Sequence, residues 1–295
     1  MRIKTSASRK VFSVANYTLL ISLAFICLYP FYYIFIFSIS DPQTAAHGNL
    51  YFFPKGLTLL SYQQVLSQGG LWHAAFISVS RTVLGTVLSV LCTSMFGYVL
   101  TQSRLKFRKA IYRMVIITMY VSSGLIPYYV VMQAYGLKDN FLLYILPGAI
   151  SAFNLVLVKT YIEQIPHSLE EAAFLDGAGY FTVFRRIIFP LCKPIVATIA
   201  IFVAVGQWNS WFDNFLLADK PWLQTLQYLL YQYIAEQSAN ATSMSMNFGL
   251  MTQAKMTPIS IRMTVTMVVT LPILFVYPIF QKYFIKGIMI GAVKG

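Results

Sequence analysis

Apolar residues gather in six stretches, each about as long as a membrane-spanning helix. A helix needs roughly 20 mostly apolar residues to cross a bilayer. The six stretches are residues 14–40, 78–100, 111–134, 141–161, 194–217 and 262–282. The pattern predicts an all-α integral membrane protein with six transmembrane helices. Its spanning domain, 14–282, would lie between an N-terminal tail, 1–13, and a C-terminal tail, 283–295.

Helix-breaking residues interrupt two of these stretches. The third contains Ser122-Ser123-Gly124 and Pro127, and the sixth contains Pro272 and Pro278. Proline removes a helical hydrogen bond, which a membrane tolerates where neighbouring helices or a water-lined cavity satisfy the backbone. The sequence leaves open whether the breaks are ordinary kinks in a bundle or part of a transport path.

The charge balance agrees with a membrane protein and gives its orientation. Only 11% of the 295 residues are charged and 58% are hydrophobic, whereas about a quarter of a soluble protein is charged. The net charge of +13 would suggest nucleic acid in a soluble protein. Here sixteen of the 22 Lys and Arg residues fall on one side of the predicted spans. The positive-inside rule therefore places both termini and the loop 162–193 in the cytoplasm, and segments 41–77 and 218–261 outside.

The chain offers no chemistry of its own for catalysis or energy conversion. No G-x-x-x-x-G-K-[ST] motif occurs, so a nucleotide-binding P-loop is excluded. The histidines and cysteines are scattered, which indicates neither a metal site nor a disulfide framework. The predicted spans hold no Asp, Glu or His apart from Asp213, although ion-driven carriers usually place such residues there. A transporter of this composition needs a separate motor.

The predicted cytoplasmic loop has an unusually ordered design. Ser168 and Glu171 fit a capping box, with Ser168 as N-cap, so a helix is expected to start there. Gly177 is placed to end this helix in a left-handed conformation. A second amphipathic helix is expected from about Tyr180 to Phe189, before Pro190.

This second helix would carry one apolar face. Its apolar residues recur at helical spacing, while Arg185 and Arg186 point away from them. The face consists of Phe181, Phe184, Ile187 and Ile188. The residues leave two interpretations open: a docking element for a cytoplasmic partner, or a packed interfacial loop.

The spacing in this loop resembles a known pattern. Glu171-Ala172-Ala173, Gly177, Ile187 and Phe189-Pro190 match E-A-A-x3-G-x9-I-x-L-P, with Phe189 in place of Leu. This is similar to the EAA loop of ABC importer permeases. Further segments resemble the carbohydrate-uptake branch of these permeases, close in plan to one of the two maltose permeases. They are Tyr29-Pro30-Phe31-Tyr32-Tyr33, Gly124-Leu125-Ile126-Pro127, residues 208–212 and residues 282–287.

The resemblance implies a type I ABC importer permease (MetI-like) fold in a bacterial cytoplasmic membrane. The chain would be the transport subunit, not an enzyme, of an ATP-driven importer of oligosaccharides. Its partners would be a second homologous permease (a heterodimer), a cytoplasmic ABC ATPase dimer that carries ATP and Mg, and an extracytoplasmic sugar-binding protein. That protein would touch segment 218–261. The residues expected to couple to the ATPase are Glu170, Glu171, Ala172, Ala173, Asp176, Gly177, Ile187 and Pro190. The alternative from another class is a stand-alone secondary carrier or channel for small polar solutes.

A candidate substrate path lies in the fifth span. Aromatic rings and amide or carboxylate groups are suited to sugars, and this span offers both in Trp208, Asn209, Trp211, Asp213 and Asn214. On a continuous helix the two tryptophans share one face, as do Asn209 and Asp213. An aromatic belt at the membrane surface, a gate and a contact with a second subunit remain alternatives. Arg81 is expected to snorkel to the interface rather than bind a ligand.

Overall fold

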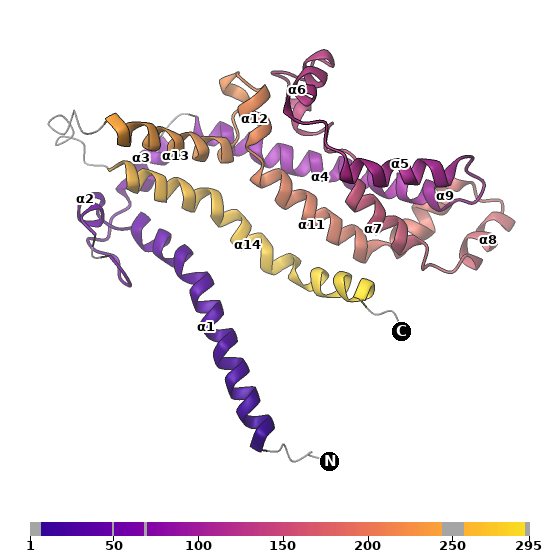
Figure 1. The fold of residues 1–295 in the computed structure, drawn as a ribbon, viewed down its shortest axis with the longest axis horizontal. Coiled ribbons are helices and arrows are strands. Elements are labelled where there is room, and N and C mark those ends of the chain that lie inside the picture. The colour runs from indigo at the N-terminus through magenta and orange to yellow at the C-terminus, as the bar shows by residue number, and fades with distance from the viewer. Residues whose placement is uncertain (1–6, 49, 68–69, 244–256, 293–295) are drawn as a thin grey trace. The chain divides into compact units, whose positions relative to one another are not determined.

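A computed structural model describes residues 7–48, 50–67, 70–243 and 257–292. Residues 244–256 of the predicted outer segment, and the extreme ends of both predicted tails, lie outside this description. All regular secondary structure in the described residues is helical, and they contain no β-strand (Figure 1). The long helices are α1 (Ala7–Ser38), α4 (Leu71–Thr101), α5 (Arg108–Tyr120), α6 (Leu125–Ala134), α7 (Ala152–Ile162), α11 (Lys193–Asn209), α13 (Leu226–Ser243) and α14 (Pro258–Ala292). The short ones are α2 (Pro42–Ala46), α3 (Leu60–Ser67), η1 (Phe141–Tyr144), α8 (Ser168–Leu175), α9 (Tyr180–Val183), η2 (Phe184–Ile188), α10 (Phe189–Leu191), α12 (Phe212–Leu217) and η3 (Pro221–Leu223).

The chain divides into two compact units. The first comprises residues 1–69 and 233–271, and the second comprises residues 70–232 and 272–295. The functional site described below lies wholly within the second unit.

The first unit is built around the end of α1. Ile36, Phe37, Ala45 and Leu50 form a small buried cluster, against which Met263 packs. The short helix α2 is capped by Asp41, whose Oδ2 accepts the Thr44 N–H at 2.9 Å and the Thr44 hydroxyl at 2.8 Å. These two bonds hold the pKa of Asp41 below its usual value. Most of α1 before Phe35 exposes apolar side chains, as a helix surrounded by lipid does.

The second unit is organised by α4, which packs along α7 and α11 (Figure 1). Small residues recur every four positions on its buried face, at Gly85, Ser89, Thr93 and Gly97. Residues four apart lie on one side of a helix, and small side chains there let helices approach closely within a membrane. A Cβ atom on Gly97 would lie 2.9 Å from Val158 Cγ1 of α7, so this approach requires glycine.

Three helices in the described residues are long and apolar enough to cross a membrane. They are Ser8–Ser38, Leu71–Thr101 and Pro258–Phe275, and they correspond to the predicted first, second and sixth spans. The fifth prediction corresponds to α11, which follows the segment Tyr180–Leu191 after a bend of 81°. The count of six spans therefore stays a prediction.

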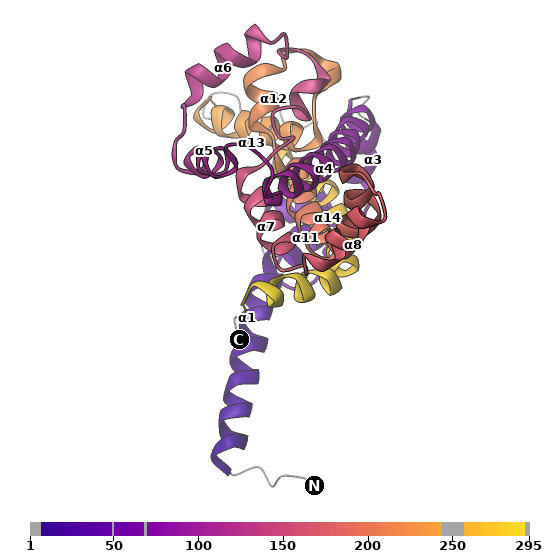
Figure 2. The same cartoon turned by 90° about the vertical axis from the view of Figure 1, so that its right-hand side faces the viewer.

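The third and fourth predicted spans are not single helices. Residues 111–134 form α5 and α6, separated by a break over 121–124 that Figure 2 makes plain. The sequence indicated this break, and Gly124 adopts the left-handed region there with φ 79°. Prediction of a continuous helix over 141–161 is wrong, because Pro147 and Gly148 lie in irregular chain between η1 and α7.

Candidate functional site

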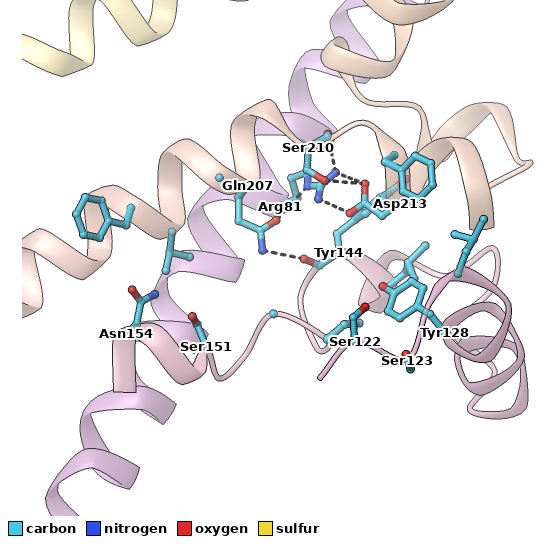
Figure 3. A pocket seen from close by; sticks show the side chains of 18 of the residues that line it. Arg81, Ser122, Ser123, Tyr128, Tyr144, Ser151, Asn154, Gln207, Ser210 and Asp213 are labelled. Carbon is cyan, nitrogen blue, oxygen red and sulfur yellow. Dashed lines mark hydrogen bonds and ion pairs between the residues drawn. The ribbon is translucent and has the colours of Figure 1, made fainter. Parts of the chain in front are cut away.

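A cavity of about 900 Å³ opens in the second unit where the broken segments meet. Its walls come from α4, from the break before α6, from the irregular chain before α7, and from the end of α11 (Figure 3). The labelled polar residues on these walls are Arg81, Ser122, Ser123, Tyr128, Tyr144, Ser151, Asn154, Gln207, Ser210 and Asp213. Irregular backbone inside a membrane is tolerated where it lines such a cavity.

Arg81 is the most buried charge at this site, with 2% of its surface exposed. Its Nη2 lies 2.5 Å from Asp213 Oδ2, and its Nη1 donates to Asp213 Oδ1 at 3.3 Å. Its Nε donates to Gln207 Oε1 at 3.2 Å, and the guanidinium lies over the Tyr144 ring, 4.3 Å from the centroid. A bidentate pair with a carboxylate satisfies the hydrogen-bond donors and the charge of a buried guanidinium.

The expectation that Arg81 snorkels to the interface is therefore wrong. Arg81 lies on the face of α4 that carries the small residues, one turn before Gly85, and so points into the bundle. Gly85 also makes room for Gln207, which bonds to Arg81, because a Cβ atom at position 85 would lie 2.8 Å from Gln207 Nε2.

The fifth predicted span breaks at Ser210, between α11 and α12. The Ser210 carbonyl accepts a bond from Arg81 Nη1 at 3.3 Å. Asp213 Oδ1 accepts bonds from the Ser210 hydroxyl at 3.1 Å and the Asn214 N–H at 2.9 Å. The ion pair thus satisfies backbone groups that the break releases.

This break changes the predicted substrate path. The shared faces expected for Trp208 with Trp211, and for Asn209 with Asp213, require one continuous helix, which the chain does not form. Of these residues, Asp213 lines the cavity. Asn209 is exposed, and the Trp211 ring stacks on Tyr231 with centroids 4.1 Å apart.

Asn214 is fully buried and holds the chain after the break in place. Its Oδ1 accepts the Thr225 N–H at 2.8 Å, and its Nδ2 donates to the Ala218 carbonyl at 3.4 Å. Both the oxygen and the amide nitrogen of the Asn214 side chain bond to other residues of the protein. Asn214 therefore stabilises the backbone next to the cavity without lining it.

A second polar junction joins the turn 136–140 to residues 218–220. Asp139 Oδ1 accepts the N–H groups of Asp219 at 2.7 Å and Lys220 at 3.1 Å. Lys138 Nζ lies 3.1 Å from Asp219 Oδ2, and this bond raises the pKa of Lys138.

At the other end of the second unit, α8 starts at Ser168 as expected, but the capping box is wrong. The N-cap is His167, which makes no side-chain capping bond; its carbonyl accepts the N–H groups of Glu170 and Glu171, each at 3.0 Å. Ser168 is already helical, because the chain turns one residue earlier, after Pro166.

The C-terminal end of α8 is a complete Schellman motif. Ala178 N–H donates to the Ala173 carbonyl at 2.9 Å, and Gly177 N–H donates to the Phe174 carbonyl at 3.1 Å. Gly177 has φ +80°, which confirms the predicted left-handed conformation. A residue with a Cβ atom would be strained there although nothing lies near it.

The two faces of α8 divide the predicted coupling residues. Glu170 is 8% exposed and faces the protein, and Ala173 packs against the core. Glu171, Ala172 and Asp176 are exposed. Leu175, which the sequence did not single out, is 89% exposed on the same side. Its i+4 spacing from Glu171 would have indicated this.

The second loop helix contains a π-helical turn, Phe184–Ile188, between α9 and α10. The extra residue in this turn shifts the apolar face. Val183, Phe184 and Ile188 are buried, whereas Phe181 is 62% exposed and so does not share one face with Phe184 and Ile188 as predicted. Ile187 and Pro190 are half-buried. The buried Cys192 thiol follows, and burial raises its pKa to about 12.

The fold and these two sites define a helical membrane transport subunit. A family model described as "Binding-protein-dependent transport system inner membrane component" matches residues 85–290, and the chain belongs to this family. It is a permease subunit of an ABC importer and not an enzyme.

Several known proteins are similar to this chain over nearly its whole length. Protein LplC of Bacillus subtilis (strain 168) is 38% identical over 99% of this chain and 97% of its own. The polygalacturonan/rhamnogalacturonan transport system permease protein YtcP of the same organism is 34% identical over 97% and 99%. One chain in the crystal structure of a bacterial ABC transporter involved in the import of the acidic polysaccharide alginate has a TM-score of 0.85 and 30% identity, over 96% of this chain and 99% of its own.

Proposed function

We propose that this permease passes oligosaccharides through a pathway that it forms with a second, homologous permease. The cavity walls support this substrate class. Among the described residues that line it, only Arg81 and Asp213 are charged, and they pair with each other. The remaining polar groups are neutral hydroxyls and amides, which suit the hydroxyl groups of a sugar.

The free energy of ATP hydrolysis would be transmitted to this subunit through α8. In this proposal both termini and the loop 162–193 are cytoplasmic, and ATP and Mg are bound by a separate ATPase dimer. The observation that carries the proposal is the outer face of α8, where Glu171, Ala172 and Leu175 are exposed on a helix whose other face is packed. A leucine exposed this fully on an ordered cytoplasmic helix is suited to a partner's apolar cleft.

An extracytoplasmic binding protein would deliver the sugar to the opposite side. The family description names binding-protein dependence, and the predicted outer segment 218–261 is the long connection on that side. Ordered contacts of its first residues with the turn 136–140 would give such a protein a defined surface.

We expect Leu175→Glu to prevent the ATPase from binding. The substitution puts a carboxylate where the partner's apolar cleft would close, and a desolvated, unpaired charge costs several kcal/mol, about 100-fold or more in affinity. The measurement is the amount of ATPase that copurifies with the tagged permease pair. Gln164→Glu adds the same charge to an exposed position of the same loop outside α8, and should copurify normally. Equal recovery of the ATPase in both variants would count against α8 as the docking element.

A further inference from the structure

The coupling loop is tied to the end of α4 by one buried carboxylate. Gln102 is the C-cap of α4, and its Nε2 donates to Glu170 Oε2 at 3.1 Å. Glu170 is 8% exposed, whereas the adjacent Glu171 is exposed. Two neighbouring carboxylates of α8 thus differ in burial: Glu170 is packed within the protein, and Glu171 is exposed.

A buried carboxylate is costly unless it is bonded, so this contact fixes how α8 sits. The contact borders a small polar cavity of about 570 Å³. The charged and titratable groups that line the cavity with Glu170 are Arg104, Arg108, Glu163, His167, Glu171 and Tyr180. Arg108, in the following helix α5, donates from Nη1 to the Thr101 carbonyl at 2.9 Å. This bond holds the same end of α4 in place.

The last turn of α4 also contacts the second helix of the loop. Tyr98 lies one turn before Gln102 and is 3% exposed. Its ring packs against Phe184 of the π-helical turn, with centroids 5.6 Å apart. One end of α4 therefore holds α8 through Glu170 and the following helical segment through Phe184.

The other half of α4 reaches the cavity. α4 is a continuous helix from Leu71 to Thr101, and Arg81 lies 21 residues before Gln102. At about 1.5 Å per residue the two are roughly 30 Å apart along one rigid element. Arg81 holds Asp213 and the break after α11, so α4 physically connects the coupling loop to the cavity wall.

We propose that Glu170 is a positioning residue for transport, which anchors α8 to Gln102 so that a displacement of α8 moves α4 and, through Arg81, the wall of the cavity. The proposal rests on the proposed function and deepens it. Glu171 and Leu175 face the partner, and Glu170 transmits their movement into the subunit's own bundle. The described residues offer a direct reporter, because Ser123 is an exposed residue on the cavity wall (Figure 3).

The test uses the full importer with a single reporter, Ser123→Cys, in a background in which the exposed Cys27 is replaced by serine. The rate of maleimide labelling at position 123, read by mass spectrometry, is compared between the nucleotide-free and the ATP–vanadate-trapped complex. We expect at least a threefold change in the parent. Glu170→Ala should abolish this change while the ATPase still copurifies. Glu170→Gln should retain it, because its amide oxygen still accepts the bond from Gln102.

Further variants separate this role from simple structural damage. Gln102→Ala should reproduce the loss, and the Glu170→Ala/Gln102→Ala double variant should be no worse than either single one. Glu163 lines the same cavity, but its carboxylate pairs with Lys159 at 2.6 Å and not with α4. The variant Glu163→Ala should therefore behave as the parent. The proposal is overturned if Glu170→Ala keeps the nucleotide-dependent change in labelling rate, or if Glu170→Gln loses that change equally. It is overturned as well if the single variant Glu170→Ala no longer copurifies with the ATPase. It is also overturned if a parent that binds the ATPase shows no change. If the parent complex binds no ATPase, the result would instead contradict the proposed function.

Discussion

Asp213→Ala should destabilise the subunit by about 3–5 kcal/mol, the usual cost of removing one partner from a buried ion pair. Arg81 is almost fully buried, and Asp213 supplies one carboxylate oxygen to each of its two Nη atoms. Without them the guanidinium stays in the bundle with the Gln207 amide oxygen and the Ser210 carbonyl as its hydrogen-bond acceptors among the described residues, beside the neutral Tyr144 ring. The measurement is the thermal unfolding midpoint of the purified permease pair in detergent, together with its monodisperse yield.

Two companion variants identify the cause. Asp213→Asn keeps an oxygen that accepts one of the bonds, so its loss should be clearly smaller. Arg81→Met combined with Asp213→Leu removes both charges and should recover most of the midpoint, because well-packed apolar residues often replace a buried pair without loss. If the double variant is as unstable as Asp213→Ala, an unpaired charge is not the reason for the defect.

This result bears on how the substrate path should be tested. The sequence alone places Asp213 in the candidate substrate path, which would make Asp213→Ala a transport variant. The structure gives Asp213 a supporting role as well, so reduced uptake in that variant would not separate sugar contact from folding. Asp213→Asn is the sharper transport test, since it changes the charge that lines the cavity and keeps most of the shape.

Gly97→Leu should destabilise the second unit by about 3 kcal/mol through overpacking. A Cβ atom at this position would already lie 2.9 Å from Val158 Cγ1 and 3.6 Å from the Lys159 backbone nitrogen, so a larger side chain forces α4 and α7 apart. We expect a lowered unfolding midpoint and reduced copurification of the second permease.

The matched control is Gly206→Ala, at a helical glycine of α11 where an added Cβ atom would meet nothing within 4 Å. It should be neutral or slightly stabilising, since alanine favours a helix over glycine. The close contact at Gly97 can also be relieved: Gly97→Ala should be rescued by Val158→Ala, which shortens the side chain that it meets. Independent, additive effects of those two substitutions would contradict the contact as the cause.

The architecture of the coupling loop could be predicted in outline from the sequence. Gly177 indicated a left-handed helix end, and the Schellman motif forms there. What could not be predicted was orientation. Glu170 and Glu171 are chemically alike, and only the packing of α8 against Gln102 decides which of them is buried. The π-helical turn was equally hidden, because helical spacing assumes 3.6 residues per turn.

The inward placement of Arg81 did have a signal in the sequence. Arg81, Gly85, Ser89, Thr93 and Gly97 recur every four residues, which puts the arginine on the face with the small side chains. Hydropathy averaged over the span conceals this stripe, since serine, threonine and glycine count as weakly polar wherever they point. The partner, Asp213, lies 132 residues away, and a single sequence gives no means of pairing the two.

The buried and the exposed carboxylate of α8 also constrain the length of this helix. Adjacent residues are about 100° apart around an α-helix, so one residue separates the anchoring face from the docking face. Deleting a single residue between His167 and Glu170 would rotate Glu171 toward Gln102, and inserting one would turn Glu170 away from it. Either change would also turn Leu175 away from the partner. The Schellman end at Gly177 fixes the same register from the other side. The loop should therefore tolerate changes of side chain on its outer surface far better than any change in its number of residues.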